Sequence, residues 1–179
     1  MDFKGSQTEK NLNDAFAGES KARNMYTFFA SQARKDGYVQ MAEIFEKTAN
    51  NEKEHAKIWF KLLNDGAVKN TETNLETSIK SENYENVSMY PGFAKTAREE
   101  GFDDIAALFE GVAKIEKYHA LRYEKLFKNL KNKEVFETPD TIVWECSNCG
   151  YRTEGKKAPE KCPVCDHPRD FFEQKNLEC

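Results

Sequence analysis

Apolar residues recur at spacings of three and four through most of this chain, from about residue 8 to residue 131. The clearest run comprises Ile105, Leu108, Phe109, Val112, Ile115 and Tyr118. This spacing predicts amphipathic helices that pack against one another through their apolar faces. After Lys133 the pattern ends, and a segment rich in cysteine, proline, glycine and aromatic residues predicts short strands and turns.

Three glycines divide the helical stretch, because a glycine commonly stands where a helix ends. They are Gly37, Gly66 and Gly101. The predicted helices cover residues 8–35, 38–63, 72–99 and 102–130. The pair Pro91-Gly92 should kink or split the third helix. The predicted fold is therefore mainly α: a four-helix bundle followed by a small β/turn domain.

The chain also repeats itself at an offset of 64 residues, so that residues 29–38 resemble residues 93–102. The same offset carries Glu52 to Glu116 and His55 to His119. Two similar helical hairpins with approximate twofold symmetry are therefore expected to form the bundle.

Each of these hairpins contains one Glu-x-x-His sequence, and residues three apart share one face of a helix. A single such pair is common by chance in charged helices and is normally solvated. Two copies at the repeat offset favour a metal site formed by Glu52, His55, Glu116 and His119. The alternative is a charged helical bundle in which the Glu-x-x-His pairs occur by chance and bind no metal.

The first and third helices should each add a carboxylate, and they offer Glu19 and Glu82. One Glu from each of two helices and Glu-x-x-His from the other two is the ligand set of ferritin-like di-iron bundles. Glu82 follows Glu19 by 63 residues rather than 64. A local bulge in one helix would absorb this one-residue difference.

Glu85 breaks the symmetry, because its counterpart in the first helix is Ala22. Five clustered carboxylates would repel one another unless cations offset their charge. Oxygen and imidazole ligands in this ratio suit iron or manganese better than zinc or copper. Tyr26 and Tyr90 also recur with the repeat and could hydrogen-bond to the ligands, although core aromatic residues are an equally good explanation.

Four cysteines form a second candidate metal site. Cys146-x-x-Cys149 and Cys162-x-x-Cys165 can place four thiolates around one ion, either iron or zinc. Cys179 remains as a free thiol. We expect a bundle domain at 1–136, a linker at 137–142 and a metal-binding domain at 143–179.

The overall composition excludes some classes of protein. A net charge of −4 argues against a nucleic-acid-binding protein, which would show a basic face. The sequence contains neither a transmembrane segment nor a signal peptide, so a cytoplasmic location is expected. Cysteines in paired motifs also indicate metal binding in a reducing compartment rather than disulfides.

These motifs together resemble those of the rubrerythrin family over nearly the whole chain. The matching segments are 17–20, 51–56, 82–85, 89–91 and the two cysteine pairs. The resemblance implies a ferritin-like di-iron bundle with a rubredoxin-like iron domain. It further implies a non-haem peroxidase that reduces hydrogen peroxide to water and protects an anaerobe or microaerophile from oxidative stress.

The resemblance also implies roles for the candidate residues. Glu52 and Glu116 would bridge the two irons, Glu19 would bind one iron, and Glu82 and His119 the other. Glu85 and His55 would exchange on the first iron as its oxidation state changes. Electrons would come from a rubredoxin or an NADH-dependent reductase through the cysteine-bound iron.

Two other functions remain open from the sequence: a ferroxidase or iron-storage protein, and a zinc-ribbon interaction module on a structural bundle. The segment between the second and third helices, near residues 65–72, looks short for a crossover along the bundle. We therefore expect a homodimer in which hairpins are swapped between chains.

Overall fold

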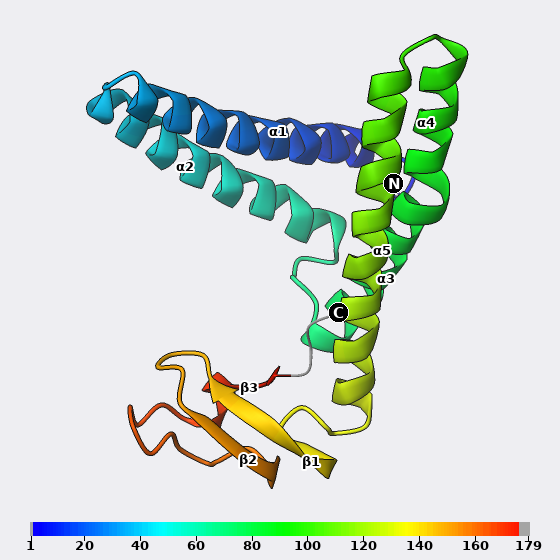
Figure 1. Ribbon diagram of the computed structural model, residues 1–179. Helices are drawn as coiled ribbons and strands as arrows, with labels where there is room; N and C mark the ends of the chain where they lie inside the picture. The colour runs from blue at the N-terminus through cyan, green and yellow to red at the C-terminus, as the bar shows by residue number, and fades with distance from the viewer. Residues whose placement is uncertain (1, 176–179) are drawn as a thin grey trace. The chain divides into compact units, whose positions relative to one another are not determined.

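The structure is a computed structural model that describes residues 2–175, so Cys179 lies outside the described residues. The chain divides into two compact units, Met1–Lys69 and Asn70–Cys179. Each unit contains one helical hairpin, and the second unit also carries the C-terminal sheet (Figure 1).

The first unit is an antiparallel pair of long helices, α1 (Gln7–Lys35) and α2 (Val39–Leu63) (Figure 1). Ser6 caps the start of α1, since its side chain accepts a hydrogen bond from the backbone N–H of Glu9. Gly37 ends α1 with a φ of 85°, a conformation that costs glycine little. The predicted ends of these helices are thus confirmed to within one residue.

The second hairpin pairs an interrupted helix with a continuous one. The interrupted helix consists of α3 (Thr71–Tyr84), a π-helical turn η1 (Glu85–Met89) and α4 (Tyr90–Glu99). Its partner is α5 (Asp103–Lys131). The predicted split near Pro91 is confirmed, because the π-helical turn ends just before that proline.

The π-helical turn accounts for the irregular offset of the repeat. Such a turn inserts one extra residue into a helix, here marked by the bond from the Tyr90 N–H to the Glu85 carbonyl. Before the turn, Glu82 follows Glu19 by 63 residues, and after it Tyr90 follows Tyr26 by 64. The bulge that the sequence predicted is therefore present, and it contains Glu85.

The two hairpins repeat one another in their side-chain contacts as well. Tyr26, Phe29 and Phe45 form a ring cluster in the first hairpin, and the residues 64 further along form the same cluster in the second. An ion pair between helices, Arg34–Glu46, recurs as Arg98–Glu110. These repeated contacts confirm the internal symmetry that the sequence predicts.

Small side chains hold each hairpin together. In the described parts of both hairpins, the fully buried apolar residues are all alanines: Ala30, Ala33, Ala42, Ala49 and Ala56, and their counterparts 64 residues later. Large apolar residues remain exposed, such as Ile44 at 59% and Leu108 at 69%. Alanine allows close helix contact, but a two-helix hairpin leaves its second apolar face open.

The C-terminal part is a three-stranded antiparallel sheet in the order β2-β1-β3 (Figure 1). Its strands are β1 (Glu137–Cys146), β2 (Arg152–Lys157) and β3 (Phe172–Gln174). The prediction of a linker at 137–142 is wrong, since these residues form the first half of β1. Glu137 pairs with Lys157 and Ile142 with Gly155, with an irregular register between them.

The sheet encloses its own core, in which Trp144, Cys146, Ala158, Cys162 and Phe172 are buried. The indole N–H of Trp144 donates to the Gly155 carbonyl over 2.9 Å, so this large ring is buried without an unpaired polar atom. Glu145, beside the buried Cys146, pairs with Arg152 on β2 and with Lys175 just after β3.

Candidate metal centres

The first unit brings together three of the predicted ligands, Glu19 from α1 and Glu52 and His55 from α2. The His55 Nδ1 lies 2.8 Å from a Glu52 carboxylate oxygen and 3.7 Å from a Glu19 oxygen. One donor atom from each residue lies within 4.8 Å of the others. This spacing allows all three to bind one metal ion.

The second unit builds the equivalent group from Glu82 on α3 and Glu116 and His119 on α5. The His119 Nδ1 lies 2.6 Å from a Glu116 oxygen and 3.3 Å from a Glu82 oxygen. Two carboxylates and one imidazole again converge within 4.8 Å. The symmetry seen in the sequence thus extends to the donor atoms.

The electrostatics of both groups favour a cation. The hydrogen bond with Glu52 raises the pKa of Glu19, and burial and the charge of Glu52 act in the same direction. Burial raises the pKa of Glu82, followed by its hydrogen bond with Glu116. Carboxylates packed this closely disfavour each other's charge, and a bound divalent ion removes that penalty.

Glu85 is not part of either three-residue group. It stands in the π-helical turn, half-buried, and its carboxylate accepts a long hydrogen bond of 3.4 Å from the Ser81 hydroxyl. The resemblance described above implies that Glu85 and His55 exchange as ligands of one iron. That exchange remains a prediction.

Tyr90 interacts electrostatically with three of the candidate ligands. Burial raises the pKa of Tyr90, and the negative charges of Glu85, Glu116 and Glu82 raise it further. Its phenol therefore stays protonated beside three carboxylates. Tyr26 packs its ring against Phe29 and Phe45, with centroid distances of 6.2 Å to each. A ligand-supporting role for either residue remains a prediction.

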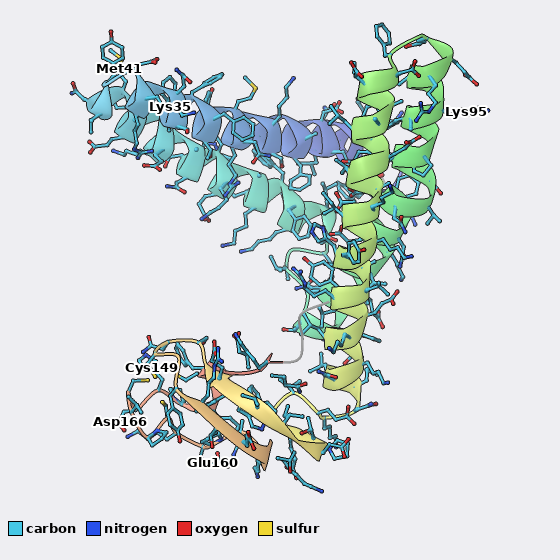
Figure 2. All side chains as sticks on the ribbon, viewed as in Figure 1. Lys35, Met41, Lys95, Cys149, Glu160 and Asp166 are labelled. Atoms are coloured by element: carbon cyan, nitrogen blue, oxygen red, sulfur yellow. The ribbon has the colours of Figure 1, made fainter. Side chains whose placement is uncertain are left out.

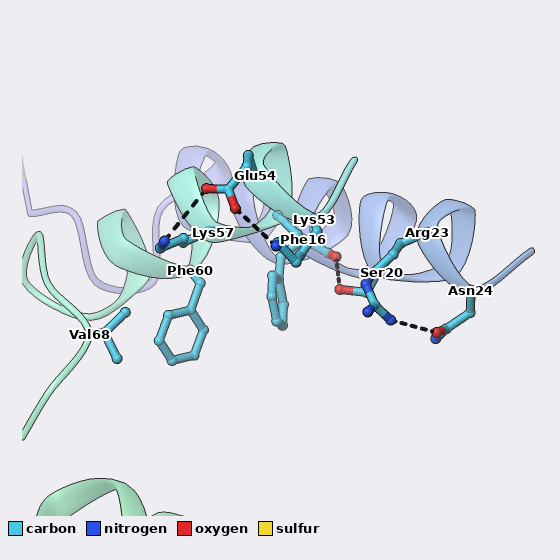
Figure 3. A pocket seen from close by; sticks show the side chains of 10 residues that line it. Phe16, Ser20, Arg23, Asn24, Lys53, Glu54, Lys57, Phe60 and Val68 are labelled. Atoms are coloured by element: carbon cyan, nitrogen blue, oxygen red, sulfur yellow. Dashed lines mark hydrogen bonds and ion pairs between the residues drawn. The ribbon is translucent and has the colours of Figure 1, made fainter. Parts of the chain in front are cut away.

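A groove of about 520 Å³ on the first hairpin is a separate feature (Figure 3). Phe16 and Phe60 form its floor with ring centroids 5.7 Å apart. At its rim Glu54 pairs with both Lys53 and Lys57, at 3.3 and 3.5 Å. These charges neutralise one another, as expected for a solvated helix face, and none of the candidate metal ligands lines the groove.

The four predicted cysteines form one cluster in the C-terminal domain, with sulfur atoms all within 4.8 Å of one another. Cys146 Sγ lies 3.7 Å from Cys165 Sγ, and Cys149 Sγ lies 3.6 Å from Cys162 Sγ. Tetrahedral ligands at metal–sulfur bonds of about 2.3 Å would be about 3.8 Å apart. The cluster therefore has the dimensions of a four-thiolate metal site.

The two cysteine loops have the same backbone design. The N–H of Cys146 donates to Tyr151 and that of Cys162 to His167, each at 2.8 Å. Gly150 and Asp166 occupy the corresponding positions with φ of 75° and 62°. Figure 2 shows Cys149 and Asp166 near the loop end of this domain.

The thiols differ in pKa, as expected for sulfur atoms that lie this close together. The backbone N–H of His167 lowers the pKa of Cys165 to about 6. The Tyr151 N–H acts likewise on Cys149, but Cys165, burial and the other two thiols outweigh it and raise the pKa of Cys149 to about 12. A bound metal cation would keep all four as thiolates.

Sequence reasoning missed these backbone donors, because an N–H group is not visible as a residue type. The signal that could have revealed them is the repeated spacing, in which Tyr151 and His167 each stand two residues after the second cysteine of a pair. The Arg34–Glu46 and Arg98–Glu110 pairs were also missed, although both recur at the repeat offset.

Comparison with known proteins agrees with both sites. The rubrerythrin family model matches residues 10–127, and a model described as the rubrerythrin rubredoxin-like domain matches residues 144–173. A rubrerythrin of Porphyromonas gingivalis is 48% identical over 182 residues, which cover 96% of this chain and 91% of that protein. One of Nitratidesulfovibrio vulgaris is 46% identical over 182 residues, covering 96% and 95%.

Among solved structures, a partially reduced nigerythrin is 32% identical and covers 94% of this chain and 86% of its own, with a TM-score of 0.37. The family models and the relatives cover both the helical part and the C-terminal domain of the chain. The Glu/His groups correspond to a di-iron site and the four cysteines to a rubredoxin-like iron site. The chain belongs to the rubrerythrin family.

Proposed function

We propose that this protein is a non-haem peroxidase that reduces hydrogen peroxide to water and protects an anaerobic or microaerophilic cell from oxidative stress. One observation carries the proposal: a four-cysteine redox site and the two Glu/His groups occur in the same chain. An enzyme that repeatedly reduces peroxide needs an electron entry site as well as a site for peroxide.

When bound, the pair of irons would supply the two electrons that reduce the O–O bond. Glu52 and Glu116 are the best candidates for bridging ligands, since they have the least exposed side chains of their groups, at 17% and 13%. Glu19, Glu82 and His119 would then be terminal ligands. Tyr90, protonated beside the carboxylates, can donate a hydrogen bond that orients them.

His55 and Glu85 are proposed to alternate as ligands of one iron. The His55 side chain is 51% exposed, compared with 41% for His119, so it has more room to move. A ferric ion favours a hard carboxylate oxygen, while a ferrous ion accepts the softer imidazole. This exchange would allow the site to adjust as electrons arrive and leave.

Electrons are proposed to enter at the cysteine-bound iron, from a rubredoxin or a reductase that draws on NADH. Cys149 is exposed, and Val164, which precedes the ligand Cys165 in the sequence, is 67% exposed. A sulfur ligand near the surface with an apolar neighbour suits short-lived contact with a redox partner. We place this reaction in the cytoplasm, where reductant keeps such thiols from forming disulfides. No helix among residues 2–175 is long and apolar enough to cross a membrane.

The proposed assembly is a homodimer with exchanged hairpins. Seven residues, 64–70, join α2 to α3, and an extended segment of that length spans roughly 25 Å at most. A helix of 25 residues, such as α2, is about 38 Å long. A connection shorter than the bundle favours pairing with the hairpin of a second chain, which would also cover the open apolar faces. Sedimentation that gives a monomer with an intact di-iron site would contradict this assembly.

The rival function is that of a ferroxidase that stores iron. The two functions differ in the oxidant that the reduced protein consumes, hydrogen peroxide or oxygen. Purified protein is supplied with reduced rubredoxin, and peroxide and oxygen are tested separately. A peroxidase consumes peroxide over many turnovers and keeps a constant iron content. Cys149→Ser should abolish this turnover but leave one round of peroxide reduction by the reduced di-iron site. A protein that ignores peroxide and accumulates ferric iron in air would be a ferroxidase.

A further inference from the structure

Gln174, the last residue of β3, joins the C-terminal sheet to the end of helix α5. Its amide nitrogen donates to the Glu134 carbonyl over 2.6 Å. Its amide oxygen accepts from the Asn129 side chain over 3.3 Å. One side chain therefore bonds both to α5 and to the segment that follows it.

These bonds lie in a sheltered position. Gln174, Asn129 and Glu134 are all partly buried. A cavity of about 220 Å³ lies beside them, with an apolar lining from Leu126, Val135, Phe136 and Phe172. Hydrogen bonds shielded from water hold geometry better than exposed ones, because water competes less for the same groups.

The position of Gln174 links the two metal sites of the chain. Helix α5 carries Glu116 and His119 in one part and Asn129 near its end. On the other side, Gln174 pairs with Trp144 in the sheet, and two residues earlier Phe172 pairs with Cys146. Gln174 thus connects a helix that carries di-iron ligands with a strand that carries a cysteine ligand.

We propose that Gln174 is a positioning residue that holds the rubredoxin-like domain at a fixed angle to α5, and so sets the rate at which electrons pass from the cysteine-bound iron to a di-iron site. This inference rests on the proposed peroxidase function. Electron transfer slows steeply with the distance between centres, so a small rotation of the domain has a large kinetic effect. Gln174 touches neither metal site and acts only through the domain it holds.

The test compares Gln174→Leu, which removes both bonds at similar size, with Asn129→Ala, which removes one. Glu173→Gln is the matched control, since Glu173 is an exposed neighbour on the same strand. Fully reduced full-length protein is mixed with peroxide, and oxidation of the di-iron site and the cysteine-bound iron is followed by their separate absorption bands. The second measurement is ¹⁵N relaxation of the zinc-loaded full-length protein, which reports how freely the domain tumbles.

Gln174→Leu should slow oxidation of the cysteine-bound iron by about tenfold, and Asn129→Ala by roughly threefold. Oxidation of the di-iron site, and the spectrum and potential of the cysteine-bound iron, should not change. The domain should tumble more independently in Gln174→Leu than in Glu173→Gln.

Equal transfer rates in Gln174→Leu and Glu173→Gln would overturn the inference, even if the domain moved more freely. Equal tumbling in these two variants would overturn it as well. If peroxide fails to oxidise the wild-type di-iron site, the proposed function fails instead. The relaxation measurement then still decides whether Gln174 fixes the domain.

Discussion

Insertion of one alanine after Asn86, in the π-helical turn, should destroy the di-iron site while the segments on either side remain helical. The turn already holds one residue more than an α-helical turn and absorbs it without changing the register of the flanking helices. A second extra residue exceeds what this turn absorbs. Everything before the insertion must then rotate relative to everything after it.

The size of the displacement follows from helix geometry. Gain of one unabsorbed residue rotates α3 by about 100° and moves it about 1.5 Å along its axis. A carboxylate about 5–6 Å from the axis would move roughly 8–9 Å. Glu82 now lies 3.3 Å from His119, and metal–ligand bonds are about 2 Å long, so the two could no longer share an ion.

The assay is iron content per chain, with Asn86→Ala as a control of unchanged helix length. The control should hold about three irons, two in the bundle and one on the cysteines. The insertion variant should keep the cysteine-bound iron and lose most of the other two, with loss of peroxide reduction. An insertion variant with wild-type iron content and activity would refute the idea that the turn, by absorbing a single residue, sets the position of Glu82.

Three further predictions concern stability. Arg34→Ala and Arg98→Ala should each lower the midpoint of denaturant titrations only slightly, because both ion pairs are about half exposed; a large loss of stability in either variant would contradict this expectation. Hydrogen bonds from a lysine and, second, from an arginine lower the pKa of Glu145 below 4.5. The stabilising effect of the ionised Glu145 is therefore complete above pH 4.5 and disappears as the pH falls through the lowered pKa. Glu145→Gln should therefore melt below wild type at pH 7, with the gap closing in acid; a gap independent of pH would exclude this cause. Trp144→Phe should cost about 1–3 kcal/mol, because it leaves a cavity and removes the hydrogen bond to the Gly155 carbonyl, and denaturant unfolding of the C-terminal domain would measure it; an unchanged unfolding midpoint would contradict this.

The candidate sites could be predicted because their signals are local or repeat. The spacing of Glu52 and His55 places both on one face of a helix. The same pair recurs at Glu116 and His119, so a chance occurrence of the motif is a poor explanation. The one-residue irregularity at Glu82 predicted a bulge, and the π-helical turn supplies it. Two cysteine pairs likewise predicted a four-sulfur cluster.

Other features depend on contacts that spacing alone does not encode. Residues 137–142 contain Pro139 and polar residues typical of a linker, yet part of this segment pairs with β2. Tertiary pairing outweighs local propensity in such a segment. The bonds of Gln174 to Asn129 and Glu134 join residues about 40 apart in the sequence, so no periodic pattern of residue types predicts these bonds.

The proposed peroxidase function is tested most directly by titrating the fully reduced protein with hydrogen peroxide in the absence of air. Metal analysis should first give about three irons per chain, and each peroxide takes up two electrons and two protons to give two waters. Three ferrous ions should therefore be oxidised by roughly 1.5 peroxides per chain, with rapid return of the ferric–thiolate colour. Zinc at the cysteines, or a reduced protein that leaves peroxide unconsumed, would contradict the account.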